Sequence, residues 1–425
     1  MSKGQTADRQ FETSNRPSLD TSILFQFHAI WVLLFILLAA TWYRFVSLIV
    51  ASAFLFFLFI AITLWKKASL NHIQPNLKLS KTRLFVDEDF LIHASVYNGK
   101  WLPLVWLEWI FSENPGVSYE NTGVNAYTVR FLWVLWFRRV EWALTGRALQ
   151  RGVYNLGQVI LRSGDGFRFA ETEKEYRLEE KLYVYPKIIP VHVPDLKPSM
   201  YWGIRGRQGG FIEDPLMVIG TREYQAGDEW RRFNWKASAR TGKLLTNVYQ
   251  PIVMEQLVIY IDVSGFVINE KAYEDPDEQK AYAFNKRKDF EKTLSVIASV
   301  GLKYKEKGVG IGFSSNALNY CGEKMPNILP GTDLTPFLDR LAQITQRVGV
   351  PRMVSLDEMN HKGQLYMPVF VFCHHIKKEH YTWFQIHKNK VSDISFFYKK
   401  ETEYSKKLDA NAKQINLFLA SNKSV

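Results

Sequence analysis

Two long apolar runs stand at the start of the hydrophobic pattern, and a short link separates them. The sequence SILFQFHAIWVLLFILLAAT covers residues 22–41, and FVSLIVASAFLFFLFIAITLW covers residues 45–65. A run of about 20 apolar residues can cross about 30 Å of hydrocarbon as a helix. The pattern therefore predicts a transmembrane helical hairpin over residues 22–66, after an amino-terminal tail of residues 1–21.

Basic residues are distributed unevenly around this predicted hairpin. Three lie before it, four lie at or after its end, and the link carries one: Lys3, Arg9 and Arg16, then Lys66, Lys67, Lys78 and Lys81, and Arg44 in the link. The positive-inside rule then places both ends of the hairpin, and the chain that follows, in the cytoplasm. A cleaved signal peptide is the weaker alternative, because a second apolar run follows at once and the start is not strongly basic.

From about residue 76 the pattern changes to short apolar stretches bounded by turn residues. Strand-type residues, several in alternation with polar ones, occupy residues 83–98, 102–111, 127–137, 140–146 and 157–163. Such spacing predicts an antiparallel, immunoglobulin-like β-sandwich over residues 76–200. FLWVLWF, at residues 131–137, is too short to span a bilayer and is predicted as a buried strand.

After residue 250, predicted strands alternate with predicted helices. The strands are residues 257–262, 309–315, 367–373 and 394–399, and the helices are residues 284–308 and 334–344. This alternation predicts an α/β unit over residues 251–425 with a mainly parallel, buried sheet. Ligands of such sheets sit beyond the carboxyl ends of the strands, so Asp262 and Ser264 are the first candidates for a site.

Composition narrows the possible functions. The 425 residues are too many for one ordinary core, and Lys plus Arg exceed Asp plus Glu by 54 to 42, which favours anionic partners such as lipid headgroups or nucleic acid. Only Cys321 and Cys373 occur, so no disulfide framework is predicted. The sequence lacks G-x-S-x-G, a Walker loop and a Rossmann G-x-G-x-x-G, and HHIKKEH (residues 374–380) lacks metalloprotease spacing and is predicted as solvated surface.

The stretch REYQAGDEWRRFNWKASARTGKL, residues 222–244, combines six cations, three acids and four aromatic rings. Its composition predicts a helix from Asp228 to Arg240, with Asp228 as N-cap and Gly242 as stop. It is interpreted either as an interdomain clamp, which is favoured, or as an exposed anion or partner site. The clamp residues would be Arg222, Tyr224, Gly227, Asp228, Arg232, Trp235, Ser238 and Arg240, within a motif and connector region of residues 201–250.

A longer stretch around this motif, GTREYQAGDEWRRFNWKASARTGKLLTN at residues 220–247, resembles the signature of the bacterial domain of unknown function 58. That pattern runs R-x-Y-x-x-G-D, then R-x-I-x-W-x-x-S-A-R-x-G-x-L. Residues 151–167 and 182–188 also resemble its approach segments. Asn234 stands where many members carry His, which disfavours acid–base work there, and SGDGFRF replaces the usual D-P-F-G-L turn.

The resemblance implies a multi-pass protein of the bacterial cytoplasmic membrane that ends in a doubly wound von Willebrand factor A-like domain. Intact A domains hold a divalent cation on D-x-S-x-S after the first strand, completed by a Thr and an Asp from later loops. Here Asp262 and Ser264 match, Phe266 takes the third position, Thr332 stands for the Thr, and residues 373–375 replace the late Asp. These residues would hold Mg²⁺ only weakly. A plain scaffold turn is the alternative reading.

The resemblance also implies a protein partner, which is a MoxR-type AAA+ ATPase. The sequence is therefore interpreted as a membrane-tethered, non-enzymatic adaptor for that ATPase, in protein maturation, protein assembly or envelope homeostasis. Nucleic acid is not an expected partner, because basic charge is common in membrane proteins. The alternatives left open are a metal-dependent hydrolase at Asp262, Cys373 and His374, and an anion- or nucleic-acid-binding membrane protein.

Overall fold

The computed structural model describes residues 27–120, 124, 126–164, 171–196, 213–251, 255–269, 275–361, 365, 367–389, 391 and 393–419. The predicted tail, residues 22–26 of the first apolar run and the Gly-rich connector before residue 213 lie outside these residues. The chain divides into two compact units. Unit 1 comprises Met1–Thr82, Glu88–Leu149 and Tyr154–Leu182, and unit 2 comprises Arg83–Asp87, Gln150–Val153 and Tyr183–Val425.

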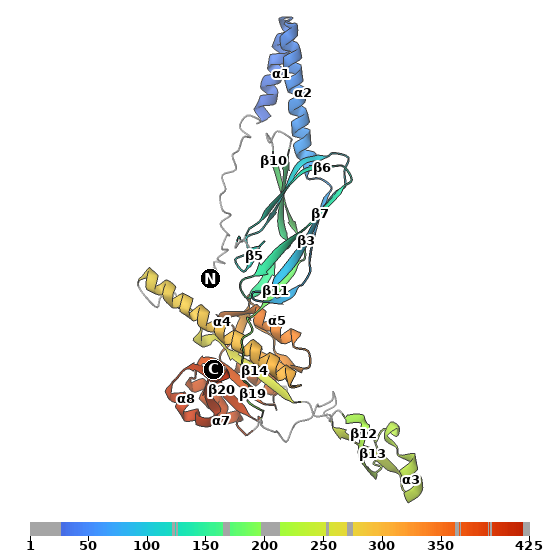
Figure 1. The fold of residues 1–425 in the computed structure, drawn as a ribbon, viewed down its shortest axis with the longest axis vertical. Helices are drawn as coiled ribbons and strands as arrows, with labels where there is room; N and C mark the ends of the chain where they lie inside the picture. The colour runs from blue at the N-terminus through green and yellow to red at the C-terminus, as the bar shows by residue number, and fades with distance from the viewer. Residues whose placement is uncertain are drawn as a thin grey trace, which may run out of the picture. The chain divides into compact units, whose positions relative to one another are not determined.

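Two apolar helices begin unit 1 and contact each other (Figure 1). The described part of α1 is Phe27–Trp42, and α2 is Val46–Ser69. By length and composition, α2 is long and apolar enough to cross a membrane, whereas α1 is a shorter apolar helix. Lys100 donates hydrogen bonds to the carbonyl oxygens of Ala68 and Ser69, which satisfies acceptors at the end of α2.

The rest of unit 1 consists mainly of two four-stranded sheets, β1-β3-β7-β5 and β10-β9-β4-β6, in which the paired strands run antiparallel. Their bounds are β1 (Ile73–Leu79), β3 (Asp89–Asn98), β4 (Leu104–Phe111), β5 (Val117–Tyr119), β6 (Thr128–Val134), β7 (Arg139–Ala148), β9 (Gln158–Gly164) and β10 (Glu171–Arg177). Trp109 of β4 and Trp142 of β7 meet edge to face with ring centroids 5.1 Å apart, so the two sheets pack face to face. The antiparallel β architecture matches the prediction.

Two predicted strands of this region were too long. Residues 83–98 form β2 (Arg83–Phe85) and β3 in different sheets, and Asp87 between them has φ 73°, which turns the chain. The prediction that FLWVLWF is a buried strand was wrong: the strand ends at Val134, the chain then turns with φ 52° at Phe137, and Trp133, Trp136 and Phe137 are exposed. Strand β2 joins β11 (Lys181–Tyr185) and β8 (Gly152–Asn155) in a small sheet.

Unit 2 contains a six-stranded sheet with the order β17-β15-β14-β19-β20-β21. The strands are β14 (Gln256–Asp262), β15 (Gly310–Ser315), β17 (Ile328–Gly331), β19 (Val369–His375), β20 (Ile394–Lys400) and β21 (Ala412–Gln414). All neighbours pair in parallel except β17, which is an antiparallel edge strand. Counted along the chain, this is the 3-2-1-4-5-6 order of a doubly wound sheet.

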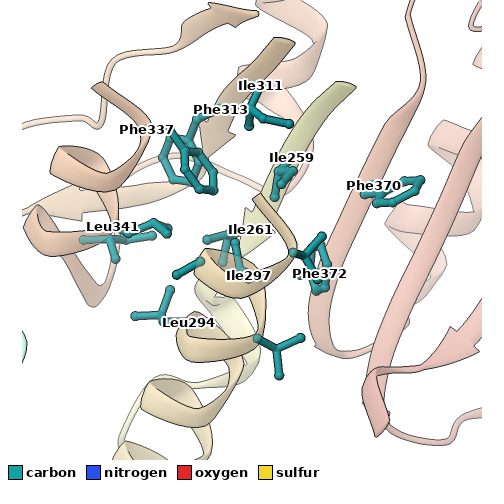
Figure 2. Packing of buried hydrophobic residues seen from close by; sticks show 14 of the residues in the cluster. Ile259, Ile261, Leu294, Ile297, Ile311, Phe313, Phe337, Leu341, Phe370 and Phe372 are labelled. Carbon is teal, nitrogen blue, oxygen red and sulfur yellow. The ribbon is translucent and has the colours of Figure 1, made fainter. Parts of the chain in front are cut away.

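Helices cover both faces of this sheet, as the alternating pattern predicted. They are α4 (Pro276–Glu306), α5 (Thr335–Gln343), α6 (Val354–His361), α7 (Lys378–His387) and α8 (Glu403–Leu408). The short 3-10 turns η4 (Asp409–Asn411) and η5 (Ile415–Phe418) and the paired strands β16 (Ala317–Asn319) and β18 (Ile344–Val348) also belong to this unit. Ile259 and Ile261 of β14 pack with Leu294 and Ile297 of α4 (Figure 2), whereas Tyr260 packs with the opposite cluster. Burial on both faces explains the nearly continuous apolar strands.

Candidate functional site

The first candidate site lies where the order of the six-stranded sheet reverses, at the carboxyl ends of β14 and β19. Asp262 ends β14 and pairs in register with Cys373 of β19. Open α/β sheets bind ligands at this crevice, because the loops leaving the two strands diverge to opposite faces. Asp262 is only 1% exposed, so its carboxylate must be satisfied inside the protein.

Three groups from distant parts of the chain surround the Asp262 carboxylate. The Asn316 side-chain amide donates to Oδ1 at 2.7 Å, and the Arg352 Nε donates to Oδ2 at 3.1 Å. His380 Nε2 lies 3.2 Å from the same Oδ2, an ion-pair distance, although its angle falls outside hydrogen-bond geometry. The backbone N–H of Ser264 completes the set by donating to Oδ1 at 2.9 Å. Both carboxylate oxygens are therefore engaged by protein groups.

These contacts determine the ionisation of Asp262. Burial alone would raise its pKa, but His380 and the hydrogen bonds from Ser264 outweigh burial and hold the pKa of Asp262 below its ordinary value. The carboxylate is thus an anion at neutral pH. Arg352 supplies the balancing permanent charge and also lies 3.6 Å from Glu379, whose side chain is exposed.

The predicted Mg²⁺ ligands are not brought together. Ser264 is adjacent to Asp262, and its Oγ accepts a 2.8 Å hydrogen bond from Asn316. Thr332 directly follows Gly331, which pairs with Ile311 opposite the start of β14. That position is five residues from Asp262 along the strand, about 16 Å at 3.3 Å per residue. Because Thr332 lies at the other end of the sheet and Arg352 occupies the charge-balancing position, the donor set does not fit Mg²⁺.

The residues of the hydrolase alternative also separate. Cys373 is fully buried in the cluster that contains Tyr260, and burial raises the pKa of its thiol well above the usual range. His374 points to the opposite face, where its ring meets Phe266 edge to face at 5.3 Å. Within the described residues, no group of three or more His, Cys, Asp and Glu side chains is arranged to hold a metal ion.

Sequence reasoning missed four members of this cluster, which are Asn316, Arg352, Glu379 and His380. The prediction that HHIKKEH is solvated was wrong for His380, which is 0% exposed and faces Asp262. The loop after β14 forms the 3-10 turn η3 (Val263–Gly265), and Lys286 of α4 donates to its Gly265 carbonyl at 2.8 Å. We name Asp262, Asn316, Arg352, Glu379 and His380 the edge cluster.

The second candidate site is the signature module, Glu213–Pro251. Strands β12 (Glu213–Glu223) and β13 (Leu245–Pro251) pair antiparallel, and η2 (Trp230–Arg232) and α3 (Trp235–Thr241) lie between them in sequence. The predicted helix from Asp228 was wrong: α3 starts only after Asn234, whose side chain accepts from the Ala237 N–H at 2.9 Å. Asparagine is a strong N-cap, so this departure from His has a structural role. Gly242 ends the helix as predicted, with φ 71°.

Asp228 instead closes the turn that precedes η2. Its carboxylate pairs with both terminal nitrogens of Arg222, at 2.8 and 2.6 Å, and accepts from the Gln225 N–H at 3.0 Å. The hydrogen bond from Arg222, followed by that from Gln225, lowers the pKa of Asp228. Gly227 has φ 110°, a backbone conformation that residues with a Cβ rarely adopt. This requirement explains the glycine directly before the aspartate in the R-x-Y-x-x-G-D pattern.

The remaining motif residues support the same module. Ser238 accepts from the Leu245 N–H at 2.9 Å and so ties α3 to β13. Phe233, which is buried, stacks between Trp230 and Trp235 at centroid distances of 5.3 and 5.1 Å, and Tyr224 packs on Phe233 at 5.2 Å. The Arg232 guanidinium lies 5.8 Å from the Tyr249 ring, and Arg240 is exposed. These contacts lie inside the module, and the interdomain clamp stays a prediction.

Comparisons with known proteins bear on both sites. A family model described as "Protein of unknown function DUF58" matches residues 220–281, which include the signature and Asp262. The "Uncharacterized protein YeaD" of Bacillus subtilis (strain 168) is 22% identical over 269 residues. Both matches support the DUF58 family. The YeaD match spans 62% of this chain and 62% of that relative, so the DUF58 likeness covers part of each protein.

Solved structures add no further argument. The chain is similar to a superoxide reductase (neelaredoxin) from Ignicoccus hospitalis, at 16% identity and TM-score 0.17, over 28% of this chain and 85% of that one. It is also similar to Spo0M, a sporulation control protein from Bacillus subtilis, at 11% identity and TM-score 0.16, over 27% and 50% of the two chains. TM-scores this low do not establish a shared fold.

Proposed function

We propose that this protein is a membrane-anchored, non-enzymatic adaptor whose doubly wound, von Willebrand factor A-like unit binds a protein partner. The proposed anchor is the α1–α2 hairpin, with the α/β unit in the cytoplasm. The resemblance to the DUF58 signature favours a MoxR-type AAA+ ATPase as the partner. A tether confines both proteins to one membrane surface and raises their effective concentration.

The observation that carries this proposal is the edge cluster. At the place where a doubly wound sheet presents its ligand site, the Asp262 carboxylate is engaged by Arg352, Asn316 and His380. A fixed guanidinium stabilises the strand-end loops without a metal and offers no nucleophile or activated water. The arrangement therefore favours recognition over catalysis.

The surface around the edge cluster supplies the proposed contact face. Most of the loop from Asp262 to Phe266 is buried, with Ser264 half-buried, so the contacts must come from its neighbours. Val267, the next residue, is 40% exposed, and the Glu379 side chain is also exposed. An open groove of about 360 Å³ lies on α4, and one of its lining residues, Lys286, donates to the Gly265 carbonyl of this loop; the groove is lined by Glu278, Ala281, Tyr282, Asn285, Lys286 and Asp289. An apolar contact beside a polar groove is suited to a protein partner.

Copurification of the full chain with the ATPase from native membranes tests the proposal. Val267→Asp and Glu379→Lys should each reduce ATPase recovery about tenfold, the size expected for a central interface contact. Leu329→Asp is the matched control, because Leu329 is half-exposed in the edge strand β17, two strands from β14 in the sheet order. Equal recovery from all three variants, with unchanged melting temperatures, would exclude this face as the contact.

A further inference from the structure

The signature module exposes a large apolar surface. In β12, Leu216 is 90% exposed, and Met217, Val218 and Ile219 are exposed beside it. Trp230 and Trp235 are 72% and 68% exposed, although both stack on the buried Phe233. Many exposed apolar side chains in one small module indicate a binding surface. The ring stack holds both indoles in fixed positions, so little side-chain freedom is lost on binding.

Positive charge accompanies this apolar surface. Residues 230–243 contain five cations and no acid: Arg231, Arg232, Lys236, Arg240 and Lys243. Two nearby acids are already neutralised within the module, because Asp228 pairs with Arg222 and Glu223 pairs with Lys243 at 2.6 Å. In the described residues no ion pair reaches Arg231, Lys236 or Arg240. Residues 230–243 therefore present three cations that no ion pair in the described residues neutralises.

We propose that the signature module docks on the anionic lipid headgroups of the membrane that anchors the chain. Indole rings beside Arg and Lys are characteristic of protein surfaces at the membrane–water interface, where the rings enter the headgroup layer and the cations contact phosphate. The apolar residues Leu216 to Ile219 would enter the acyl boundary. This inference uses the proposed membrane anchor but not the ATPase.

The aliphatic residues favour lipid over nucleic acid. Single-stranded nucleic acid is bound by rings and cations, which the module has, but a stacking platform gains nothing from the exposed aliphatic residues of β12. An acidic protein surface could also bind the cations and the rings, and the experiment below distinguishes that partner from lipid. Docking on the chain's own domains, as the clamp hypothesis predicts, is the other outcome.

A fluorescent label in the module measures docking in the full chain. Ala239 is an exposed position of α3, and Cys321 is the exposed thiol, whereas Cys373 is buried. The background is therefore Cys321→Ser with Ala239→Cys, labelled with an environment-sensitive probe and reconstituted in nanodiscs. In phosphatidylcholine with phosphatidylglycerol, we expect a blue-shifted emission and protection from iodide. In phosphatidylcholine alone, or at high salt, both effects should be lost.

Two variants separate the charge and the ring contributions. Arg231→Gln/Lys236→Gln/Arg240→Gln should reduce the docked fraction about tenfold or more, since each basic residue near an anionic surface contributes several-fold. Trp230→Ser/Trp235→Ser should lower docking while keeping its salt dependence. The charge-matched control is Arg287→Gln/Lys288→Gln/Lys292→Gln on the exposed side of α4, which should leave the label unchanged.

Other results would overturn the proposal. A label buried equally in both lipid mixtures, and insensitive to salt, would show that the module packs on its own chain. A shift that requires added single-stranded RNA or the ATPase would assign the face to that partner. A label that stays exposed under every condition would show that the signature module does not dock on lipid. ATPase recovery with the Val267→Asp variant is a separate measurement, so failure of either proposal is recognised independently.

Discussion

At the scale of single residues, Asp262 shows how a buried carboxylate at the edge of a sheet is held by groups from distant parts of the chain. The carboxylate follows a buried strand, where an A-type domain would hold a cation, but Arg352 lies 3.1 Å from it. A buried ion pair adds little net stability over an apolar pair, yet breaking it leaves one charge uncompensated. The pair therefore fixes the loop geometry more than it stabilises the fold.

Arg352→Met should consequently destabilise unit 2 strongly. The variant leaves the Asp262 anion buried without its permanent counter-charge, and we expect a loss of about 3–5 kcal/mol. Thermal unfolding of the full chain in detergent, followed by circular dichroism, measures the change. Adding Asp262→Asn to Arg352→Met should recover part of the loss, because the buried charge is then gone. Additive losses in the double variant would contradict a direct interaction.

The paired histidines at the end of β19 predict a pH dependence. Burial, followed by Lys286 and His375, lowers the pKa of His374 from 6.5 to about 4. Between these values the unfolded chain binds a proton that the folded chain does not, so stability should fall as pH decreases from 6.5 towards 4. His374→Gln should flatten the curve in this range, by at most about 1.4 kcal/mol per pH unit. Parallel curves for both proteins would rule out the His374 contribution.

At the scale of elements, the signature module is built around turns and caps. The pattern R-x-Y-x-x-G-D has a physical reading: Gly227 permits the turn, Asp228 accepts from its backbone, and Arg222 neutralises Asp228. The charge spacing had predicted one continuous helix from Asp228. Asp228 engages the preceding turn, however, so the helix starts at the next available cap, Asn234.

Asn234→Ala should therefore loosen α3. Loss of the N-cap hydrogen bond typically costs about 1 kcal/mol, which is substantial for a helix of seven residues. Hydrogen exchange at the amides of α3 should accelerate about fivefold, the equivalent of that free energy. Asn234→Ser, which keeps a capping oxygen, is the control and should exchange nearly as the wild type does. Unchanged exchange in the Ala variant would show that packing alone holds α3.

At the scale of the whole molecule, α2 is long and apolar enough to cross a membrane, and the proposed function uses it as the tether of the doubly wound unit. The full topology can be tested with the cysteines, because Cys321 is exposed and Cys373 is buried. A membrane-impermeant maleimide should leave intact cells unlabelled and should label Cys321 once the membrane is opened. Cys321→Ser should remove that signal. Labelling of intact cells would place unit 2 on the outer side and exclude a cytoplasmic ATPase as partner.

The local pattern of apolar and polar residues was sufficient to predict much of this architecture. The four central strands of the α/β unit were predicted within a few residues, because burial on both faces requires continuous apolar runs such as LVIYID, whereas the edge strands β17 and β21 were not predicted. Asp262 and Ser264 could be found as candidates, because they follow such a strand directly. Turns were predicted less well. Residues 83–98 contain a turn at Asp87, which has a positive φ, and the alternation of apolar and polar residues gives no sign of it.

The sequence by itself determined the apolar helices, the change from antiparallel to α/β architecture and the location of the signature motif, since each depends on neighbours within a few positions. Only the tertiary structure decided what surrounds Asp262. Asn316, Arg352 and His380 lie between 54 and 118 positions away in sequence, and sheet order brings them to one edge. It also placed Thr332 at the opposite edge, because β17 runs antiparallel to its neighbour. Hydrophobic periodicity specifies which face of a strand is buried, but it carries no information about which distant polar groups meet there.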